Sequence, residues 1–217
     1  MGMFDCIGFI GVGVMGEPMC RNLALKGGDK VLAYDIDPAP LERLAVDGVV
    51  AADSLAELCA KTHTILMSLP DGELVRLACY GEHGLLENLT SGQSVIDCGT
   101  SPPQLARELH QAFAAKNIAF ADAPVARTRQ AAIDGTLSIM VGGDKSVFDR
   151  IQPILACMAS DITHCGGSGA GQTVKILNNM MLFQNCAAIA EALAIARRAG
   201  LDEELFLQTV GKSSGED

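Results

Sequence analysis

The chain has 217 residues, of which 49% are hydrophobic and 19% charged, and this balance favours a compact globular protein over a disordered one. Its formal net charge of −10 argues against nucleic acid and against an anionic membrane surface as partners, because phosphate recognition requires a basic face. With 4% aromatic residues and no tryptophan, the core must consist of Val, Ile, Leu, Ala and Met. Together with 23 glycines, this composition favours an α/β protein with closely packed helices.

The cysteines and the N-terminus give no sign of export. The 8 cysteines are far apart and form no CxxC pair, which argues against both a secreted disulfide scaffold and a metal site. The N-terminus lacks the pattern of a signal peptide, and no uninterrupted apolar run approaches the roughly 18 residues of a membrane span. The sequence therefore predicts a cytoplasmic protein with reduced thiols, no bound metal and no membrane segment.

Short apolar runs alternate with helical patterns along most of the chain. The expected strands are residues 6–11, 30–37, 62–70, 93–100, 118–124, 137–144 and 161–166. The expected helices between them are residues 14–27, 40–46, 71–81, 102–116 and 146–159. Repeated strand–helix–strand order with short connections predicts an α/β fold with a doubly wound, mostly parallel sheet.

The pattern changes after the turn GGSGAG. Residues 172–200 contain no proline and no internal glycine and are apolar on most faces, which predicts one long helix buried between domains or subunits. A second helix begins after residue 201. We therefore expect a nucleotide-binding domain over residues 1–166, followed over residues 167–217 by the long helix and an incomplete all-α domain. Because these two helices cannot bury their own apolar surface, we expect a longer chain or a partner subunit.

The stretch GFIGVGVMGEPM carries Gly11, Gly13 and Gly16 in the spacing GxGxxG, directly between a predicted strand and a predicted helix. The first glycine permits a tight turn, the second lets a pyrophosphate approach the backbone, and the third allows close packing of helix on strand. The N-terminus of the helix then faces the phosphates. In this context the motif predicts a Rossmann-type dinucleotide site.

Asp35 stands at the end of the second predicted strand, where a carboxylate accepts hydrogen bonds from the adenosine ribose. Because it repels a 2′-phosphate, Asp35 favours NAD over NADP. Asp37 takes this role if the strand ends two residues later. The main competing class is an S-adenosylmethionine-binding Rossmann domain, which usually lacks the third glycine and the long apolar helix.

None of the four histidines falls in a predicted site. We place His63 at a strand entry, His110 on a helix face, and His83 and His164 in loops. A dehydrogenase that uses histidine as its acid/base is therefore not favoured.

Lys175 lies instead in the first turns of the long apolar helix. Desolvation of the ammonium lowers its pKa, so that the amine can exchange a proton with a substrate oxygen near neutral pH. Asn178 or Asn179 could hold the same oxygen. The alternative interpretation is a lysine whose head group extends to water.

Five stretches occur in the order seen in the β-hydroxyacid dehydrogenases, the 3-hydroxyisobutyrate dehydrogenase-like oxidoreductases. They are GFIGVGVMGEPMCRNL, SLPDG, IDCGT, DAPVARTRQAAIDGTLSIMVGGD and GSGAGQTVKILNN. The resemblance covers essentially the whole chain. It implies a Rossmann domain joined by a long helix to an all-helical domain, and hydride transfer between NAD(P) and a short 3-hydroxy acid or its aldehyde.

Carried over by position, the resemblance implies that Lys175 is the catalytic acid/base and Asn179 its partner. It argues against the related imine reductases, which generally lack this lysine. The implied cofactor-binding residues are Gly11, Val12, Gly13, Val14, Met15, Gly16, Asp35, Leu69, Pro70, Gly99 and Thr100. In these relatives the helical domain continues past the position of Asp217 and supplies dimer contacts, so we expect a homodimer or homotetramer.

The residues after DAPV depart from the family pattern. Most members have Ser-Gly-Gly there, whereas this chain has Ala126, Arg127 and Thr128. The sulfolactaldehyde reductases have Gly-Arg-Thr at this place, which the Arg-Thr of this chain resembles. The planar fork of donors on an arginine guanidinium suits a sulfonate. Arg127 and Thr128 are therefore predicted to bind the anionic end of the substrate, with Arg129 on the surface. The alternative is that Arg127 pairs with a carboxylate such as Asp134.

A second departure concerns the long helix, where Leu182 stands in place of the serine of those reductases. Leu182 favours an anionic hydroxy acid with a bulkier or more apolar body. The sequence predicts an NAD-dependent oxidoreductase that acts on a small anionic 3-hydroxy acid or its aldehyde, with a carboxylate or sulfonate head group. The rival hypothesis is a non-catalytic NAD-binding sensor or scaffold with a degenerate substrate domain.

Overall fold

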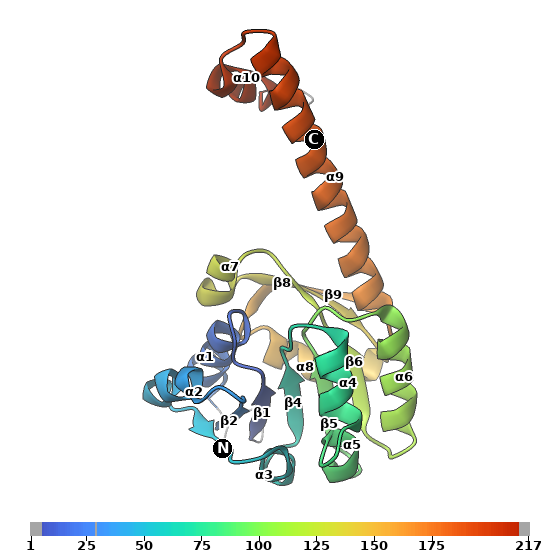
Figure 1. Cartoon of the computed structure of the whole chain (residues 1–217). Helices are drawn as coiled ribbons and strands as arrows, with labels where there is room; N and C mark the ends of the chain where they lie inside the picture. Colours follow the sequence, from blue (N-terminus) through green and yellow to red (C-terminus); the bar gives the residue numbers. More distant parts are fainter. Residues whose placement is uncertain (1–5, 29, 213–217) are drawn as a thin grey trace. The chain divides into compact units, whose positions relative to one another are not determined.

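A computed structural model of the chain describes residues 6–28 and 30–212. The chain divides into two compact units at the peptide bond between Lys175 and Ile176. The first unit contains a sheet with helices on both faces (Figure 1). The second unit contains most of one long helix and one short helix.

The described strands form one mixed sheet of 9 strands. They are β1 (Ile7–Ile10), β2 (Val31–Tyr34), β3 (Val50–Ala51), β4 (Thr64–Met67), β5 (Ser94–Asp97), β6 (Ala119–Asp122), β7 (Val125–Ala126), β8 (Leu137–Gly142) and β9 (Ala159–Gly166). The helices of the first unit are α1 (Gly16–Gly27), α2 (Pro38–Leu44), the 3-10 helix η1 (Ala45–Asp47), α3 (Leu55–Lys61), α4 (Gly72–Tyr80), α5 (Leu85–Asn88), α6 (Pro103–Ala114), α7 (Arg129–Asp134) and α8 (Lys145–Leu155). Two helices follow, α9 (Ala170–Arg198) and α10 (Glu203–Val210).

Six neighbouring strands run parallel in the order β3-β2-β1-β4-β5-β6. This is the strand order of a Rossmann fold, and the chain reverses its direction of winding between β1 and β4. Beyond β6, the strand β8 runs antiparallel to β6 and β7 and parallel to β9. The expectation of a doubly wound, mostly parallel sheet is confirmed.

Alternate residues of the strands feed two separate cores, as the period of two in a strand requires. On one face, Phe9 and Leu66 pack with apolar residues of α1, α7 and α8. On the other face, Ile10 and Met67 pack with apolar residues of α3, α4, α5 and α6. Burial on both faces is why these strands read as continuous apolar runs in the sequence.

Several short elements were not expected from the sequence, namely β3, β7, α3, α5 and α7. A capping signal marks two of them. Ser54 accepts a hydrogen bond from the Glu57 N–H at the start of α3, and Thr128 accepts one from the Ala131 N–H at the start of α7. The loop position expected for His164 is also wrong, because this residue lies within β9, where its Nε2 contacts the Gly143 carbonyl oxygen at 2.8 Å.

The long helix α9 is confirmed, but its expected burial is not found within the described chain. Only 6% of its most apolar 18-residue window is buried. By length and composition α9 is the one described helix apolar enough to cross a membrane, and the core helix of a globular protein can have the same length and composition.

Candidate active site

A cleft of about 930 Å³ lies at the carboxyl ends of β1, β2, β4 and β5, where the strand order reverses. Ligands of doubly wound sheets bind at this place because the loops on either side of the reversal separate there. The cleft is lined by every predicted cofactor-binding residue except Val12. Val12 is buried beneath the loop, so its side chain belongs to the core.

The glycine-rich loop has the geometry that its sequence predicts. Gly11 has φ +85°, and a Cβ atom there would lie 2.5 Å from the Ser68 carbonyl oxygen. A Cβ atom on Gly16 would overlap the Gly11 carbonyl oxygen. At Gly13, by contrast, a Cβ atom would meet nothing within 4 Å. The first and third glycines are therefore required by the fold itself, whereas the second faces open space that a ligand can fill.

The N-terminus of α1 opens onto this loop. Met15 at the N-cap makes no side-chain hydrogen bond to the helix, so the first-turn N–H groups receive no side-chain cap there. Glu17 in the first turn is neutralised by Arg43 and Arg21, and its pKa is lowered chiefly by the hydrogen bond from Arg43. The positive end of the helix dipole is thus available to an anion.

Asp35 follows β2 directly and supports the glycine-rich loop. Its Oδ2 accepts the Val12 N–H at 2.7 Å, and its Oδ1 accepts the Asp37 N–H at 2.9 Å. Each carboxylate oxygen retains a second lone pair, so both can still accept from a ribose hydroxyl. Asp37 also lines the cleft, but its Oδ1 accepts the Ala39 N–H and caps α2.

Sequence reasoning missed several apolar residues of the cleft. Ile36, next to Asp35, is 92% exposed, and the other missed apolar residues include Leu55, Leu74 and Leu77. Their apolar surface suits a flat heteroaromatic ring. No local motif marks them, because they come from three separate loops and helices that only the fold brings together.

Lys175 is half-buried near the start of α9, and its pKa is lowered by this burial. No carboxylate among the described residues contributes to the shift, so nothing there favours the charged form. Asn178, Asn179 and Leu182 follow it in the same helix at spacings of three, four and seven residues, which places all four side chains on one helix face. Asn178 and Leu182 are exposed, and Asn179 is partly exposed.

Arg127 does not pair with Asp134. Its Nη2 donates to Asp161 Oδ2 at 2.7 Å and its Nη1 to Ser160 Oγ at 2.9 Å, both on β9. Asp134 instead accepts from Gln130 at 2.9 Å. The pKa of Asp161 is lowered by the Ser160 hydroxyl and by Arg127. Arg127 thus faces β9 and is not among the residues that line the cleft.

The backbone of Arg127 has φ +83°, a conformation that disfavours residues other than glycine. Thr128, which was predicted to contact substrate, caps α7 with its hydroxyl at 3.4 Å from the Ala131 nitrogen. Arg129 is exposed, as expected. Of this segment, Val125 is the residue that lines the cleft.

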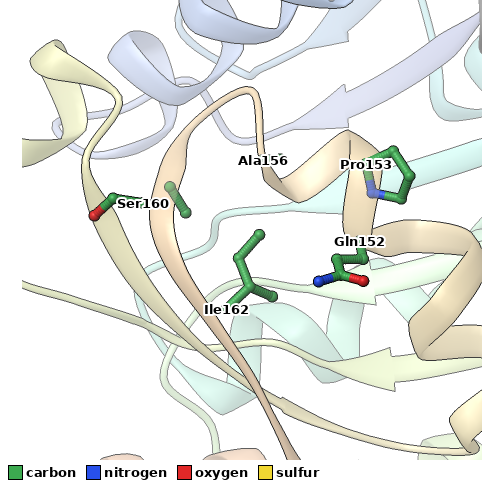
Figure 2. Close-up of a pocket in the computed structure, with 6 residues that line it drawn as sticks. Gln152, Pro153, Ala156, Ser160 and Ile162 are labelled. Carbon is green, nitrogen blue, oxygen red and sulfur yellow. The ribbon is translucent and has the colours of Figure 1, made fainter.

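A second hollow, of about 420 Å³, lies between α8 and β9 (Figure 2). Figure 2 shows Gln152 and Pro153 of α8, with Ala156 just after the helix, opposite Ser160 and Ile162 of β9. The residues that line it carry no charge and no group suited to acid–base chemistry. The cleft at the strand ends is therefore the candidate active site.

The comparisons with known proteins divide the chain into two matches. Residues 6–167 match the family model for the NAD binding domain of 6-phosphogluconate dehydrogenase. Residues 169–217 match the model described as NAD-binding of NADP-dependent 3-hydroxyisobutyrate dehydrogenase. The second match contains the whole of α9 and α10, so the apolar helix lies within a segment that the family model covers.

Two curated relatives are similar over 96% of the chain. The 3-hydroxyisobutyrate dehydrogenase of Pseudomonas aeruginosa is 40% identical, and the chain covers 70% of it. The 2-(hydroxymethyl)glutarate dehydrogenase of Eubacterium barkeri is 39% identical, and the chain covers 69% of it. Among solved structures, the 3-hydroxyisobutyrate dehydrogenase of Mycobacterium tuberculosis with L-serine has a TM-score of 0.91 and 36% identity, over 98% of this chain and 72% of that one.

The open space at Gly13 generates a test of the cleft. Gly13→Ala adds a methyl group that meets no protein atom within 4 Å, so the melting temperature should stay within about 2 °C of wild type. The same methyl group stands where a pyrophosphate approaches, so NADH affinity should fall by about tenfold or more. NADH fluorescence titration measures the affinity.

Gly167→Ala is the matched control, because a Cβ atom there also meets nothing within 4 Å and the residue lies outside the cleft. It should leave both quantities unchanged. Wild-type NADH affinity in Gly13→Ala would contradict the placement of the pyrophosphate.

Proposed function

The chain belongs to the β-hydroxyacid dehydrogenase family, and we propose on that premise that it uses Lys175 to exchange a proton with the oxygen of a small anionic 3-hydroxy acid or its aldehyde. The protein is an NAD-dependent oxidoreductase of hydroxy acids. The observation that carries the proposal is a half-buried lysine with a lowered pKa on the helix that follows a dinucleotide cleft.

In the oxidation direction, the neutral amine of Lys175 removes the proton of the substrate hydroxyl. In reduction, the ammonium donates that proton to the carbonyl oxygen. A bound nicotinamide supplies the hydride acceptor or donor. Asn179, one helical turn beyond Lys175, and Asn178 beside it offer side-chain N–H groups that hold the same oxygen.

The adenosine end is held by the loop after β1 and by Asp35. The first-turn N–H groups of α1 bind the pyrophosphate, and Ile36 and Leu74 provide apolar surface for the adenine. We propose that NAD is preferred over NADP, because the carboxylate of Asp35 accepts from the ribose hydroxyls and repels a 2′-phosphate. Thr100 and the backbone at Gly99 orient the nicotinamide.

Arg127 can bind the anionic head group of the substrate only by leaving Asp161. Both side chains of this pair are about half exposed, so the pair contributes about 0–1 kcal/mol. A charge-assisted hydrogen bond that is shielded from water contributes about 1.5–3 kcal/mol, so exchange of partners is favourable where the bound substrate excludes water from its carboxylate or sulfonate. Thr128 and Leu182 would then set the size of the substrate body.

Two features of the chain bear on its compartment and on its assembly. The eight cysteines are far apart in the sequence and form no CxxC pair, which supports a reducing compartment, so we propose that the protein is cytoplasmic. The exposed apolar residues of the second unit include Met181, Phe183 and Ile195. Surface of this kind supports a homodimer or homotetramer, and gel filtration with light scattering measures the assembly.

Lys175→Ala should lower kcat by a factor of about 100 to 10,000, because it removes the acid/base. NADH affinity should stay within about twofold of wild type, since Lys175 does not line the cofactor cleft. In wild type, the oxidation rate should rise with pH as the lysine loses its proton, and the reduction rate should fall. The control is Lys145→Ala, which removes an exposed lysine of α8 and should keep full activity. A Lys175→Ala enzyme with wild-type kcat would refute the assignment.

Wild type should prefer NADH to NADPH by about tenfold or more in kcat/KM, about 1.4 kcal/mol. Asp35→Asn keeps an oxygen acceptor for the Val12 N–H but removes the charge, so the preference should shrink. The control is Asp53→Asn, which neutralises an exposed carboxylate outside the cleft and should leave the preference intact. Equal rates with both cofactors in wild type would disprove the role of Asp35.

Asp161→Asn should free Arg127 for the substrate and raise kcat/KM for an anionic aldehyde by about twofold to fivefold, the equivalent of the weak surface pair. Arg127→Gly should lower the same quantity by about tenfold, in line with one charge-assisted hydrogen bond. The control substrate is an uncharged aldehyde of similar size, for which neither variant should matter. If both variants match wild type on the anionic aldehyde, Arg127 only tethers its loop to β9.

A further inference from the structure

The side-chain amide of Gln172 forms hydrogen bonds with the peptide groups on both sides of Thr100. Its Nε2 donates to the Gly99 carbonyl oxygen at 2.9 Å, and its Oε1 accepts the Ser101 N–H at 3.0 Å. The side chain of Gln172 is fully buried, and it is satisfied at both ends by these two bonds. Thr100 itself is exposed and lines the cofactor cleft.

The opposite side of this loop is held by Asp97, the last residue of β5. Its Oδ1 accepts the Gly99 N–H at 3.0 Å, and its Oδ2 accepts the Ser101 hydroxyl at 2.9 Å. Burial, together with the nearby Asp122, raises the pKa of Asp97 to about 7. The loop that carries Thr100 is therefore fixed from two directions, by β5 and by α9.

Gln172 is itself anchored through its backbone. The buried carboxylate of Asp122, at the end of β6, accepts the Gln172 N–H at 2.9 Å and the Gly169 N–H at 2.7 Å. These bonds satisfy two N–H groups at the start of α9 and hold it to the sheet. A Cβ atom on Gly142 or Gly171 would lie within 3 Å of this carboxylate, so the backbone of both glycines packs closely against it.

Lys175 lies three residues after Gln172, on the same helix. The path from Thr100 to Lys175 therefore consists of one bidentate amide and one turn of helix, both within the first compact unit. We infer that Gln172 is a positioning residue, which sets the distance between the nicotinamide loop and the proton-exchanging amine. This inference rests on the proposed function of Lys175 and Thr100.

If Gln172 is a positioning residue, its loss should affect the rate of hydride transfer and not the affinity for the cofactor. Gln172 touches neither the adenosine end of the cleft nor its glycine-rich loop, so its loss should spare cofactor affinity. Displacement of the loop relative to Lys175 should slow the transfer step, because a misplacement of about 1 Å can cost about 100-fold in rate. A residue with a merely structural role would lower affinity, rate and stability together.

Two variants and one control test this inference in the full-length protein. Gln172→Met keeps the shape of the side chain and removes both hydrogen bonds. Gln172→Glu keeps the acceptor for Ser101, and when protonated it also restores the donor for Gly99. Gln104→Met, an exposed glutamine of α6, is the control. The readouts are NADH affinity by fluorescence, and the single-turnover rate of NADH oxidation with an anionic aldehyde.

We expect Gln172→Met to lose about 100-fold in single-turnover rate while NADH affinity stays within about twofold. Gln172→Glu should regain much of its rate at low pH and lose it as pH rises, relative to wild type at each pH. Two carboxylates belong to the same hydrogen-bond network: Asp97 accepts the Ser101 hydroxyl, and Asp122 accepts the backbone N–H of residue 172. When ionised, both favour the protonated form of the new group.

A wild-type single-turnover rate in Gln172→Met would overturn the inference, and so would a parallel loss of rate and NADH affinity. If Gln172→Met does not fold, the pH profile of Gln172→Glu decides, and a profile equal to that of wild type overturns the inference. Failure of the proposed function gives a different result. In that case wild type itself would bind NADH, but none of the anionic aldehydes would support oxidation of the bound NADH.

Discussion

The candidate site depends on one buried carboxylate, Asp122, which holds the first turn of α9 against the end of the parallel sheet. A charge without solvent is costly unless its hydrogen bonds are made, and here two backbone N–H groups at a helix N-terminus supply them. Through this contact, the sheet that forms the dinucleotide cleft also fixes the start of the helix that carries Lys175. The dinucleotide cleft and Lys175, the residue proposed to exchange the proton, are thereby tied to the same sheet.

The electrostatics of the cleft fit an acidic protein that must bind an anionic cofactor. Among the described residues that line the cleft, the charged ones are Asp35, Asp37 and Glu82, and none is a lysine or an arginine. The groups that can attract a pyrophosphate are therefore the N–H groups at the N-terminus of α1 and in the backbone of the glycine-rich loop. Arg43 pairs with Glu17, and Arg21 bridges Glu17 and Asp47, so these positive charges are held by carboxylates of the protein and Glu17 is neutralised beside the same N–H groups.

Local patterns in the sequence were sufficient to predict the sheet, the glycine-rich loop and the helix of Lys175. Each depends on residues close together in the chain: apolar runs, the spacing of Gly11, Gly13 and Gly16, and a turn followed by an apolar helix. Contacts between distant residues could not be predicted in this way. Arg127 meets Asp161 34 residues away, and Gln172 meets Gly99 73 residues away, and no spacing rule links such pairs.

Roles of single side chains show the same limit. The resemblance assigns Thr128 to the substrate, and no local pattern indicated that its hydroxyl also caps α7. Ile36 was overlooked, because an exposed isoleucine in the cleft looks like any other apolar residue after a strand. The roles of Lys175, Asn179 and Arg127 in chemistry remain predictions that rest on side-chain type and position.

The most direct test of the account is NADH oxidation by the full-length protein with two small aldehydes, one with a carboxylate and one with a sulfonate. The account predicts that at least one of them is reduced, with a rate that falls as pH rises through the pKa of Lys175. Reduction of neither aldehyde by a protein that binds NADH would contradict it.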